Sequence, residues 1–154
     1  MDEIFSLTRM WPVEPIPDED KLYFRIHKTF LQKNPELPPA SAFTNTPKDG
    51  DNISTDWSKY ATPEECRDLV SKMVNKEGKS KDPNQYTVYS FGVGDVRKMK
   101  AITPEVIHDP IYNEPEALGK PNNRAHSIIK TGKTGNDTRF RMELVELGRW
   151  AIRS

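Results

Sequence analysis

Prolines are the feature that most limits what this chain can fold into. Its 154 residues include 13 prolines and 8 glycines. Each proline removes a backbone hydrogen-bond donor and restricts the residue before it, so helices and strands fit only in the gaps between prolines. The hydrophobic fraction of 34% lies below the roughly 45 to 50% of a typical globular chain, which predicts a small core. We therefore predict an extended proline-rich arm over residues 1–20 and a single domain over 21–154, with long proline-rich loops.

Two segments of the sequence predict the main helices, at about 62–75 and 137–152. Thr62 can cap the first helix, Pro63 suits its first position, and Glu65 can return a hydrogen bond to the cap. Apolar residues recur at helical spacing behind this cap. The second helix is predicted from an apolar face made of Phe140, Leu144, Leu147 and Ala151.

Four segments predict strands: 21–31, 86–93, 105–111 and 125–130. In the first segment, Leu22, Phe24 and Ile26 alternate with polar residues, as in a strand with one buried face. Residues 86–93 are rich in β-branched and aromatic side chains, which favour strands. A short turn of helix is expected at 96–100. Strands interspersed with helices predict an α+β fold with a small mixed or antiparallel sheet.

The charge and cysteine content argue against several classes of function. With 23 basic and 23 acidic residues the net charge is zero, whereas nucleic-acid-binding domains are typically basic. The single cysteine, Cys66, rules out an internal disulfide and lies on the apolar side of the first helix, where a buried thiol is typical. The sequence predicts neither a signal peptide nor a membrane-spanning segment. We expect a cytoplasmic protein that uses no metal or cofactor.

Aromatic and apolar residues near the prolines are candidates for binding a protein partner. Trp11, Val13 and Ile16 lie in the proline-broken arm, which can either wrap its own domain or dock on a partner in polyproline geometry. Trp57 and Tyr60 flank the first helix, where they can pack on it or lie exposed in an interface. The sequence leaves both alternatives open for each group.

The three histidines, His27, His108 and His126, are the candidate catalytic residues. Each lies in or beside a predicted strand, and histidine titrates near neutral pH, which suits general acid and base catalysis. The segment around His27 resembles the hydrophobic-His-x-Thr-hydrophobic motif of two-histidine phosphoesterases. This resemblance implies that His27 acts with a second histidine as general acid and base, and that the Thr29 hydroxyl binds phosphate. The second motif is incomplete, because Ile128 stands where its hydroxyl belongs.

A longer set of motifs resembles a family of small bacterial proteins of no known activity. The matching motifs are Leu22-Tyr23-Phe24-Arg25-Ile26-His27, Ser41-Ala42-Phe43, residues 53–60 with Pro63-Glu64-Glu65, Val93-Gly94-Asp95-Val96-Arg97, His108-Asp109-Pro110 and Asn123-Arg124-Ala125-His126. The resemblance implies a prokaryotic setting and a stand-alone domain. It marks Arg25, Asp56, His108 and His126 as matching positions.

Two functions from different classes follow from these features. The first is a protein-binding module, an accessory subunit of a prokaryotic multi-protein system such as a defence system. The second is a histidine-dependent enzyme on a phosphate- or nucleotide-containing substrate, in which Arg25, Arg124 and Asp56 are the candidate substrate-binding or anion-binding residues. An ADP-ribosyl-transfer-like enzyme is a further form of the second function, suggested by Arg25 and His27 on one strand and Ser54 on a later one.

Overall fold

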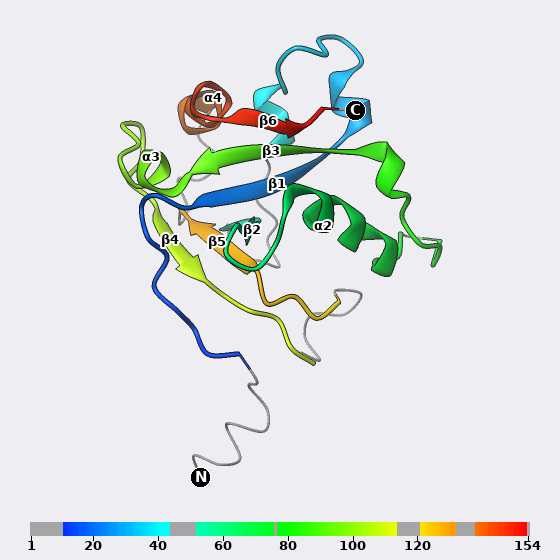
Figure 1. Ribbon diagram of the computed structural model, residues 1–154. Coiled ribbons are helices and arrows are strands. Elements are labelled where there is room, and N and C mark those ends of the chain that lie inside the picture. The colour runs from blue at the N-terminus through cyan, green and yellow to red at the C-terminus, as the bar shows by residue number, and fades with distance from the viewer. Residues whose placement is uncertain (1–10, 44–51, 76, 114–120, 132–137, 154) are drawn as a thin grey trace.

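The computed structural model describes residues 11–43, 52–75, 77–113, 121–131 and 138–153 (Figure 1). Within them, six strands form one antiparallel sheet in the order β4-β5-β2-β1-β3-β6. The strands are β1 (Lys21–His27), β2 (Asn52–Trp57), β3 (Tyr86–Gly92), β4 (Glu105–His108), β5 (His126–Lys130) and β6 (Arg149–Ile152). The described helices are α2 (Pro63–Asp68), α3 (Val93–Arg97) and α4 (Thr138–Leu147), with 3-10 turns η1 (Lys28–Leu31), η2 (Ala40–Ala42), η4 (Leu69–Lys72) and η5 (Pro83–Gln85). The predicted α+β fold is confirmed, and none of these helices is long and apolar enough to cross a membrane.

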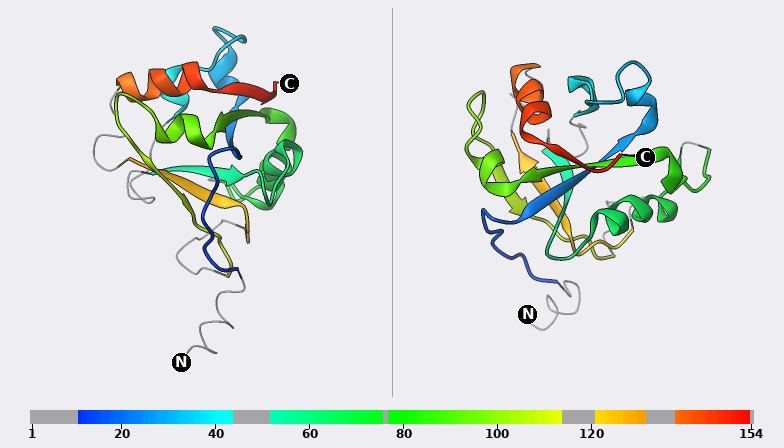
Figure 2. Two further views of the ribbon diagram at one scale, coloured as in Figure 1. Left: turned by 60° about the vertical axis from the view of Figure 1, so that its left-hand side comes forward. Right: turned by 45° about the horizontal axis from the view of Figure 1, so that its top comes forward.

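Different elements cover the two faces of the sheet. In β1, Leu22 and Ile26 are 0% and 1% exposed and belong to the main core. Arg25, which points to the other face, donates a hydrogen bond to the carbonyl of Cys66 in α2 at 3.0 Å. The right-hand view of Figure 2 shows α4 and α2 on either side of β3 and β1. The main core also contains Phe43, Tyr89, Phe91, Val93, Val96, Phe140 and Leu144.

The beginning of α2 forms the capping box that the sequence predicts. The backbone amide of Glu65 donates to the Thr62 hydroxyl at 3.1 Å, and the Glu65 carboxylate accepts from the Thr62 amide at 3.0 Å. Cys66 and Val70 are each 1% exposed and anchor this segment on the sheet. The α-helix ends at Asp68 and continues as the 3-10 turn η4, so the helical segment is shorter than the predicted 62–75.

The prediction that the last helix extends to residue 152 is wrong. The helix α4 ends at Leu147, and Arg149–Ile152 form the edge strand β6, in which Trp150 pairs with Tyr89. Phe140 and Leu144 are buried as predicted, but Ala151 lies on the strand and not on the helix. The Tyr89 ring explains the change of direction, because it packs edge-on against Trp150, with ring centroids 4.9 Å apart. Residue 137 of the predicted helix lies outside the described residues.

The strand β2 is absent from the elements that the sequence predicts. Its residues, Asn52–Trp57, include few apolar side chains, yet Thr55 and Asp56 are 2% and 1% exposed. Hydrogen bonds satisfy these buried groups: the Thr55 hydroxyl, for example, donates to the Ser127 carbonyl at 3.2 Å. A central strand covered on both faces loses the polar alternation that would reveal it.

Three predicted boundaries shift by a few residues. The first strand ends at His27 and not at 31, because the His27 side chain accepts from the Thr29 amide and starts η1. The helical turn expected at 96–100 begins at Val93, directly after β3. The strand predicted over 105–111 ends at His108, before Pro110.

Residues 16–20 lie against the domain and are held by α3. The carbonyls of Asp18 and Asp20 accept from the amides of Gly94 and Val93, each at 2.9 Å. Arg97 donates to the carbonyl of Ile16 at 2.6 Å, and Ile16 is 4% exposed in the main core. This part of the predicted arm therefore wraps its own domain. Residues 1–10 lie outside the described residues.

Replacing Gly148 by alanine is expected to destabilise the fold by about 1 to 3 kcal/mol. A Cβ atom at Gly148 would lie 2.1 Å from Cε2 of Tyr89, a core ring that cannot move aside without losing its contact with Trp150. Urea unfolding followed by circular dichroism measures the change. Gly92→Ala is the matched control, because its Cβ would meet only the carboxylate of the exposed Asp95; an equal loss in both variants would contradict the explanation.

Candidate functional site

The three histidines do not come together in one site. His27 ends β1, where its Nδ1 lies 3.0 Å from the Thr29 hydroxyl and its ring meets Tyr86 edge-on. His126 pairs with Asp56, which pairs with Tyr23, so its backbone lies about 16 Å from that of His27. A general acid and base must both reach one substrate at hydrogen-bond range, which this separation does not favour.

His108 is buried and both of its ring nitrogens are occupied. It pairs with Ser127, so its side chain points to the face of the sheet opposite to that of His126. Its Nδ1 accepts from the Glu14 amide at 3.1 Å, and its Nε2 donates to the Arg124 carbonyl at 2.7 Å. This arrangement fixes one neutral tautomer and leaves no lone pair for a metal or a substrate. His108 therefore joins the N-terminal segment to the residues before β5.

His126 has one unoccupied ring nitrogen. Its Nδ1 lies 2.7 Å from the Asp109 carbonyl and donates to it, which leaves the lone pair on Nε2. Nε2 is buried and has no hydrogen-bond partner within the described residues. Across those residues no group of three or more histidine, cysteine or acidic side chains is arranged to hold a metal ion. Among the described residues, no side chain therefore forms a catalytic pair with this nitrogen.

Arg25 and Asp56, two candidate anion-binding residues, are paired with each other. Nη1 of Arg25 donates to Asp56 Oδ2 at 2.8 Å, while Asp56 Oδ1 accepts from Asn123 Nδ2 at 2.7 Å. Asp56 is 1% exposed and Arg25 is 18% exposed. Burial is the largest effect and lowers the pKa of Arg25, but the charges and hydrogen bonds of Asp56 and Cys66 together raise it by more, so the guanidinium stays charged. This buried pair holds β1, β2 and α2 together, and Asp56 already occupies the nitrogen that faces it.

The Cys66 thiol belongs to the same buried region. It lies 3.5 Å from Nη1 of Arg25 and is 1% exposed. Burial raises the pKa of Cys66 well above its ordinary value, and the Asp56 carboxylate raises it further. The thiolate, which is the nucleophilic form, is therefore disfavoured in the folded protein.

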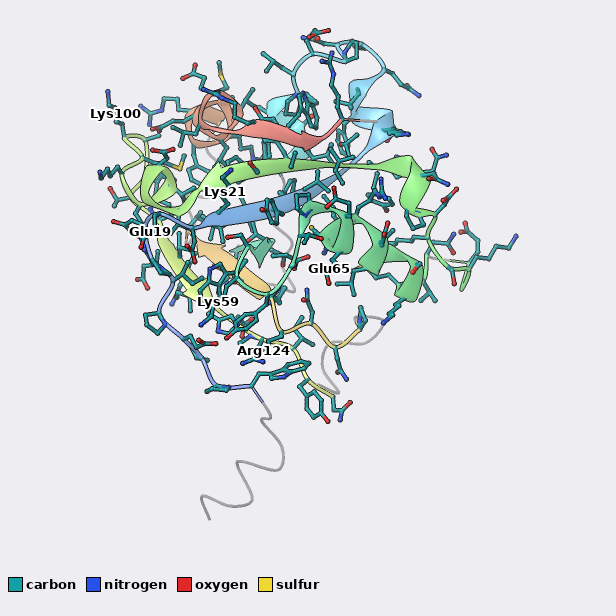
Figure 3. All side chains as sticks on the ribbon, in the orientation of Figure 1. Glu19, Lys21, Lys59, Glu65, Lys100 and Arg124 are labelled. Atoms are coloured by element: carbon teal, nitrogen blue, oxygen red, sulfur yellow. The ribbon has the colours of Figure 1, made fainter. Side chains whose placement is uncertain are left out.

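The exposed Arg124 stacks on the partly buried Tyr60 beside His108. The guanidinium carbon of Arg124 lies 4.1 Å from the centroid of the Tyr60 ring, and Nη2 of Arg124 donates to the Tyr60 hydroxyl at 3.2 Å. The Tyr60 ring also stacks on His108 and meets Trp57 edge-on. Figure 3 shows Arg124 and Lys59 in the same region of the surface. Arg124 makes no ion pair with a carboxylate in the part of the chain that the structure describes.

Glu14 fixes the orientation of Tyr60. Its carboxylate accepts from the Tyr60 hydroxyl through Oε2 and from Nζ of Lys59 at 2.7 Å through Oε1. The hydrogen bonds from Lys59 and Tyr60 lower the pKa of Glu14, and the bond to Glu14 raises the pKa of Lys59. Glu14 and Lys59 are therefore both charged at neutral pH. The Tyr60 ring cannot change its orientation without breaking the hydrogen bond of its hydroxyl to Glu14.

The N-terminal segment extends this surface. Trp11 meets Tyr112 edge-on with ring centroids 5.0 Å apart, and Val13 is 56% exposed. The isolated bridge between Ile111 and Asn123 brings Tyr112 to the chain just before Arg124. We call this region the aromatic–cation surface; it consists of Trp11, Val13, Glu14, Lys59, Tyr60, Tyr112 and Arg124.

The structure separates the five candidate partner-binding residues into two groups. Ile16 and Trp57 are 4% and 1% exposed in the main core, and Trp57 Nε1 donates to Asp20 at 2.8 Å. Trp11, Val13 and Tyr60 contribute to the aromatic–cation surface. Sequence reasoning missed Glu14, Lys59 and Tyr112. In the sequence, Tyr60 only flanks the predicted first helix. The contact of Glu14 with Lys59 and Tyr60 arises from the fold.

The variant Asp56→Asn is expected to lose about 3 kcal/mol of stability, because it leaves the largely buried Arg25 charge without its counter-charge. The expected loss of stability lies at the low end for a buried ion pair, because the Arg25 side chain remains 18% exposed. Urea unfolding measures the loss. Glu36→Ala, which breaks an exposed pair with Arg153, serves as the control and should cost less than about 1 kcal/mol. Similar losses in the two variants would show that the Arg25–Asp56 pair is not stabilising.

The Cys66 thiol is expected to resist dithionitrobenzoate in the folded protein and to react at once when the protein is unfolded in guanidinium at about 6 M. Absorbance of the released thiolate measures the rate. Because burial raises the thiol pKa, the native rate should stay low as the pH rises from 7 to about 8.5, the ordinary cysteine pKa. A fast native reaction would mean that the thiol is accessible and ionised.

Comparison with known proteins does not place this chain in a family. No family model, no curated protein and no solved structure matches it. The resemblance of its motifs to small bacterial proteins therefore stays a prediction.

Proposed function

We propose that this chain is a protein-binding module, an accessory subunit of a prokaryotic multi-protein system, which binds its partner through the aromatic–cation surface. The observation that carries the proposal is the exposed guanidinium of Arg124, stacked on Tyr60 and without a carboxylate partner among the described residues. Tryptophan, tyrosine and arginine are the residues that dominate binding energy at protein interfaces. The surface contains all three types.

The fold holds this surface in place before any partner binds. Tyr60 is fixed by Glu14 and His108, and the backbone of Glu14 is fixed in turn by Nδ1 of His108. A side chain that is already ordered loses little conformational entropy on binding, whereas a free one costs about 0.5 to 1.5 kcal/mol. The arrangement therefore favours binding by a preformed surface.

The chemistry of the surface indicates the kind of partner. The planar guanidinium of Arg124 can pair with a carboxylate through two parallel hydrogen bonds. Val13, at 56% exposure, and the Trp11–Tyr112 pair offer apolar area close to it. The partner we propose is a protein segment that carries an aspartate or glutamate next to an apolar side chain.

Site-specific photo-cross-linking in the native host tests this function. Val13 and Met142 are replaced, one at a time, by p-benzoylphenylalanine, because their exposures match at 56% and 53% and Met142 lies in α4, outside the surface. We expect one discrete adduct from position 13, none from position 142, and loss of the adduct when Arg124→Glu is added. Lys100→Glu, which lies at the upper left of Figure 3 and well away from Arg124, should leave the adduct intact.

Three outcomes would reject the proposal. They are no adduct at position 13, equal adducts at positions 13 and 142, or an adduct that is indifferent to Arg124→Glu. An adduct with the mass of two copies of this chain would replace the accessory-subunit function by self-association.

A further inference from the structure

A pocket of about 450 Å³ lies on the face of the sheet that carries α2, apart from the aromatic–cation surface. The antiparallel register aligns Tyr23 of β1, Ser90 of β3 and Arg149 of β6 directly across the three strands. Residues opposite one another in neighbouring strands point to the same face, so these three side chains form one row. The pocket is lined by Lys21, Tyr23, Pro63, Ser90, Gly92, Asp95, Leu147, Arg149, Trp150 and Ala151.

The polar groups of this pocket have few partners within the protein. The Lys21 ammonium and the hydroxyls of Tyr23 and Ser90 make no hydrogen bond or ion pair to another described residue. Arg149 donates only to the carbonyl of its neighbour Gly148, at 3.3 Å. Burial raises the pKa of Tyr23, so its hydroxyl remains a donor at neutral pH. Two cations and two hydroxyls therefore face one cavity with unused donors.

The spacing allows both cations to reach one ligand. Lys21 lies two residues along β1 from Tyr23, and Arg149 lies two strands across from it, so the two backbones are about 12 Å apart. A lysine and an arginine side chain each extend several ångströms and can meet an anion placed between them. The carboxylate of Asp95 lines one side of the pocket, and Glu64 lies close enough to raise the pKa of Tyr23. These two carboxylates reduce the net positive charge of the pocket, so a bound anion has to lie on the side of Lys21 and Arg149.

The remaining walls are apolar. Pro63, Leu147, Trp150 and Ala151 contribute to the lining, and the volume lies within the range of roughly 300 to 1,000 Å³ that is usual for small-molecule sites. A ligand with a charged end and a ring would fit both parts of the lining. Arginine, lysine and hydroxyl donors are the groups that proteins use for phosphate and carboxylate.

We propose that this pocket binds a small organic anion, a phosphate monoester or a carboxylate attached to an apolar group, between Lys21 and Arg149. The Tyr23 and Ser90 hydroxyls donate to the oxygens of the anion, and the part of the lining that contains Pro63 and Ala151 receives the apolar group. This site is independent of the proposed protein partner, which binds to different residues.

Titration of the ¹⁵N-labelled chain by NMR tests the proposal. The probes are phenyl phosphate, benzoate and benzyl alcohol, which share a ring and differ in charge. We expect one or both anions to shift the amides of Ser90, Gly92 and Arg149, and benzyl alcohol to bind at least tenfold more weakly. Binding of phenyl phosphate alone assigns the site to phosphate esters, and binding of benzoate alone assigns it to carboxylates.

Matched arginine variants give the decisive comparison. Arg149→Gln should raise the dissociation constant of the bound anion at least tenfold, because a charge-assisted hydrogen bond is lost. Arg153→Gln, an exposed arginine at the other end of the same C-terminal segment, should leave it within twofold. Lys21→Gln provides a second test if Arg149→Gln does not fold. Equal losses in the Arg149 and Arg153 variants, no binding of either anion, or equal binding of benzyl alcohol would overturn the proposal.

Discussion

The buried pair of Arg25 and Asp56 is the interaction on which the rest of the structure depends. Taking both charges out of water is costly, and the cost is offset only where further hydrogen bonds satisfy the remaining atoms. Here the Cys66 carbonyl accepts from Arg25, and Asn123 donates to Asp56. The pair therefore connects β1, β2, α2 and the chain before β5. Because α2 contributes the Cys66 carbonyl to this network, the pair also fixes α2 against the second face of the sheet.

The aromatic–cation surface follows from that arrangement. Asn123 is held by Asp56, and the next residue, Arg124, gives its carbonyl to His108 and its guanidinium to Tyr60. His108 in turn accepts from the Glu14 amide, which brings the N-terminal segment to the same end of the sheet. A buried network of neutral and paired groups thus orders the exposed Arg124 and the partly buried Tyr60. His108 supports this surface, while the proposed anion pocket lies across β1, β3 and β6.

Sequence patterns predicted those elements whose stabilising contacts are local. The capping box of Thr62 and Glu65 spans four residues, and the alternation of Leu22, Phe24 and Ile26 spans five, so both are visible in the sequence. The strand β2 was not predicted, because its polar residues Thr55 and Asp56 are buried and form hydrogen bonds with residues far along the chain. The aromatic–cation surface was predicted in part: Trp11, Val13, Tyr60 and Arg124 were candidates, whereas Glu14, Lys59 and Tyr112 were not.

The sequence by itself determined the α+β class, the position of the capped helix and the burial of Cys66, because hydrophobic spacing and capping are local properties. Only the tertiary structure decided that Arg149–Ile152 form a strand, since Tyr89, which is far along the chain, packs against Gly148 and pairs with Trp150. The same holds for the histidines. All three were candidate catalytic residues in the sequence, but hydrogen bonds to Glu14 and Arg124 commit His108 to the framework, and the register of the sheet separates His27 from His126. A titratable side chain acquires its role from its partners, and those partners are set by the pairing of the strands.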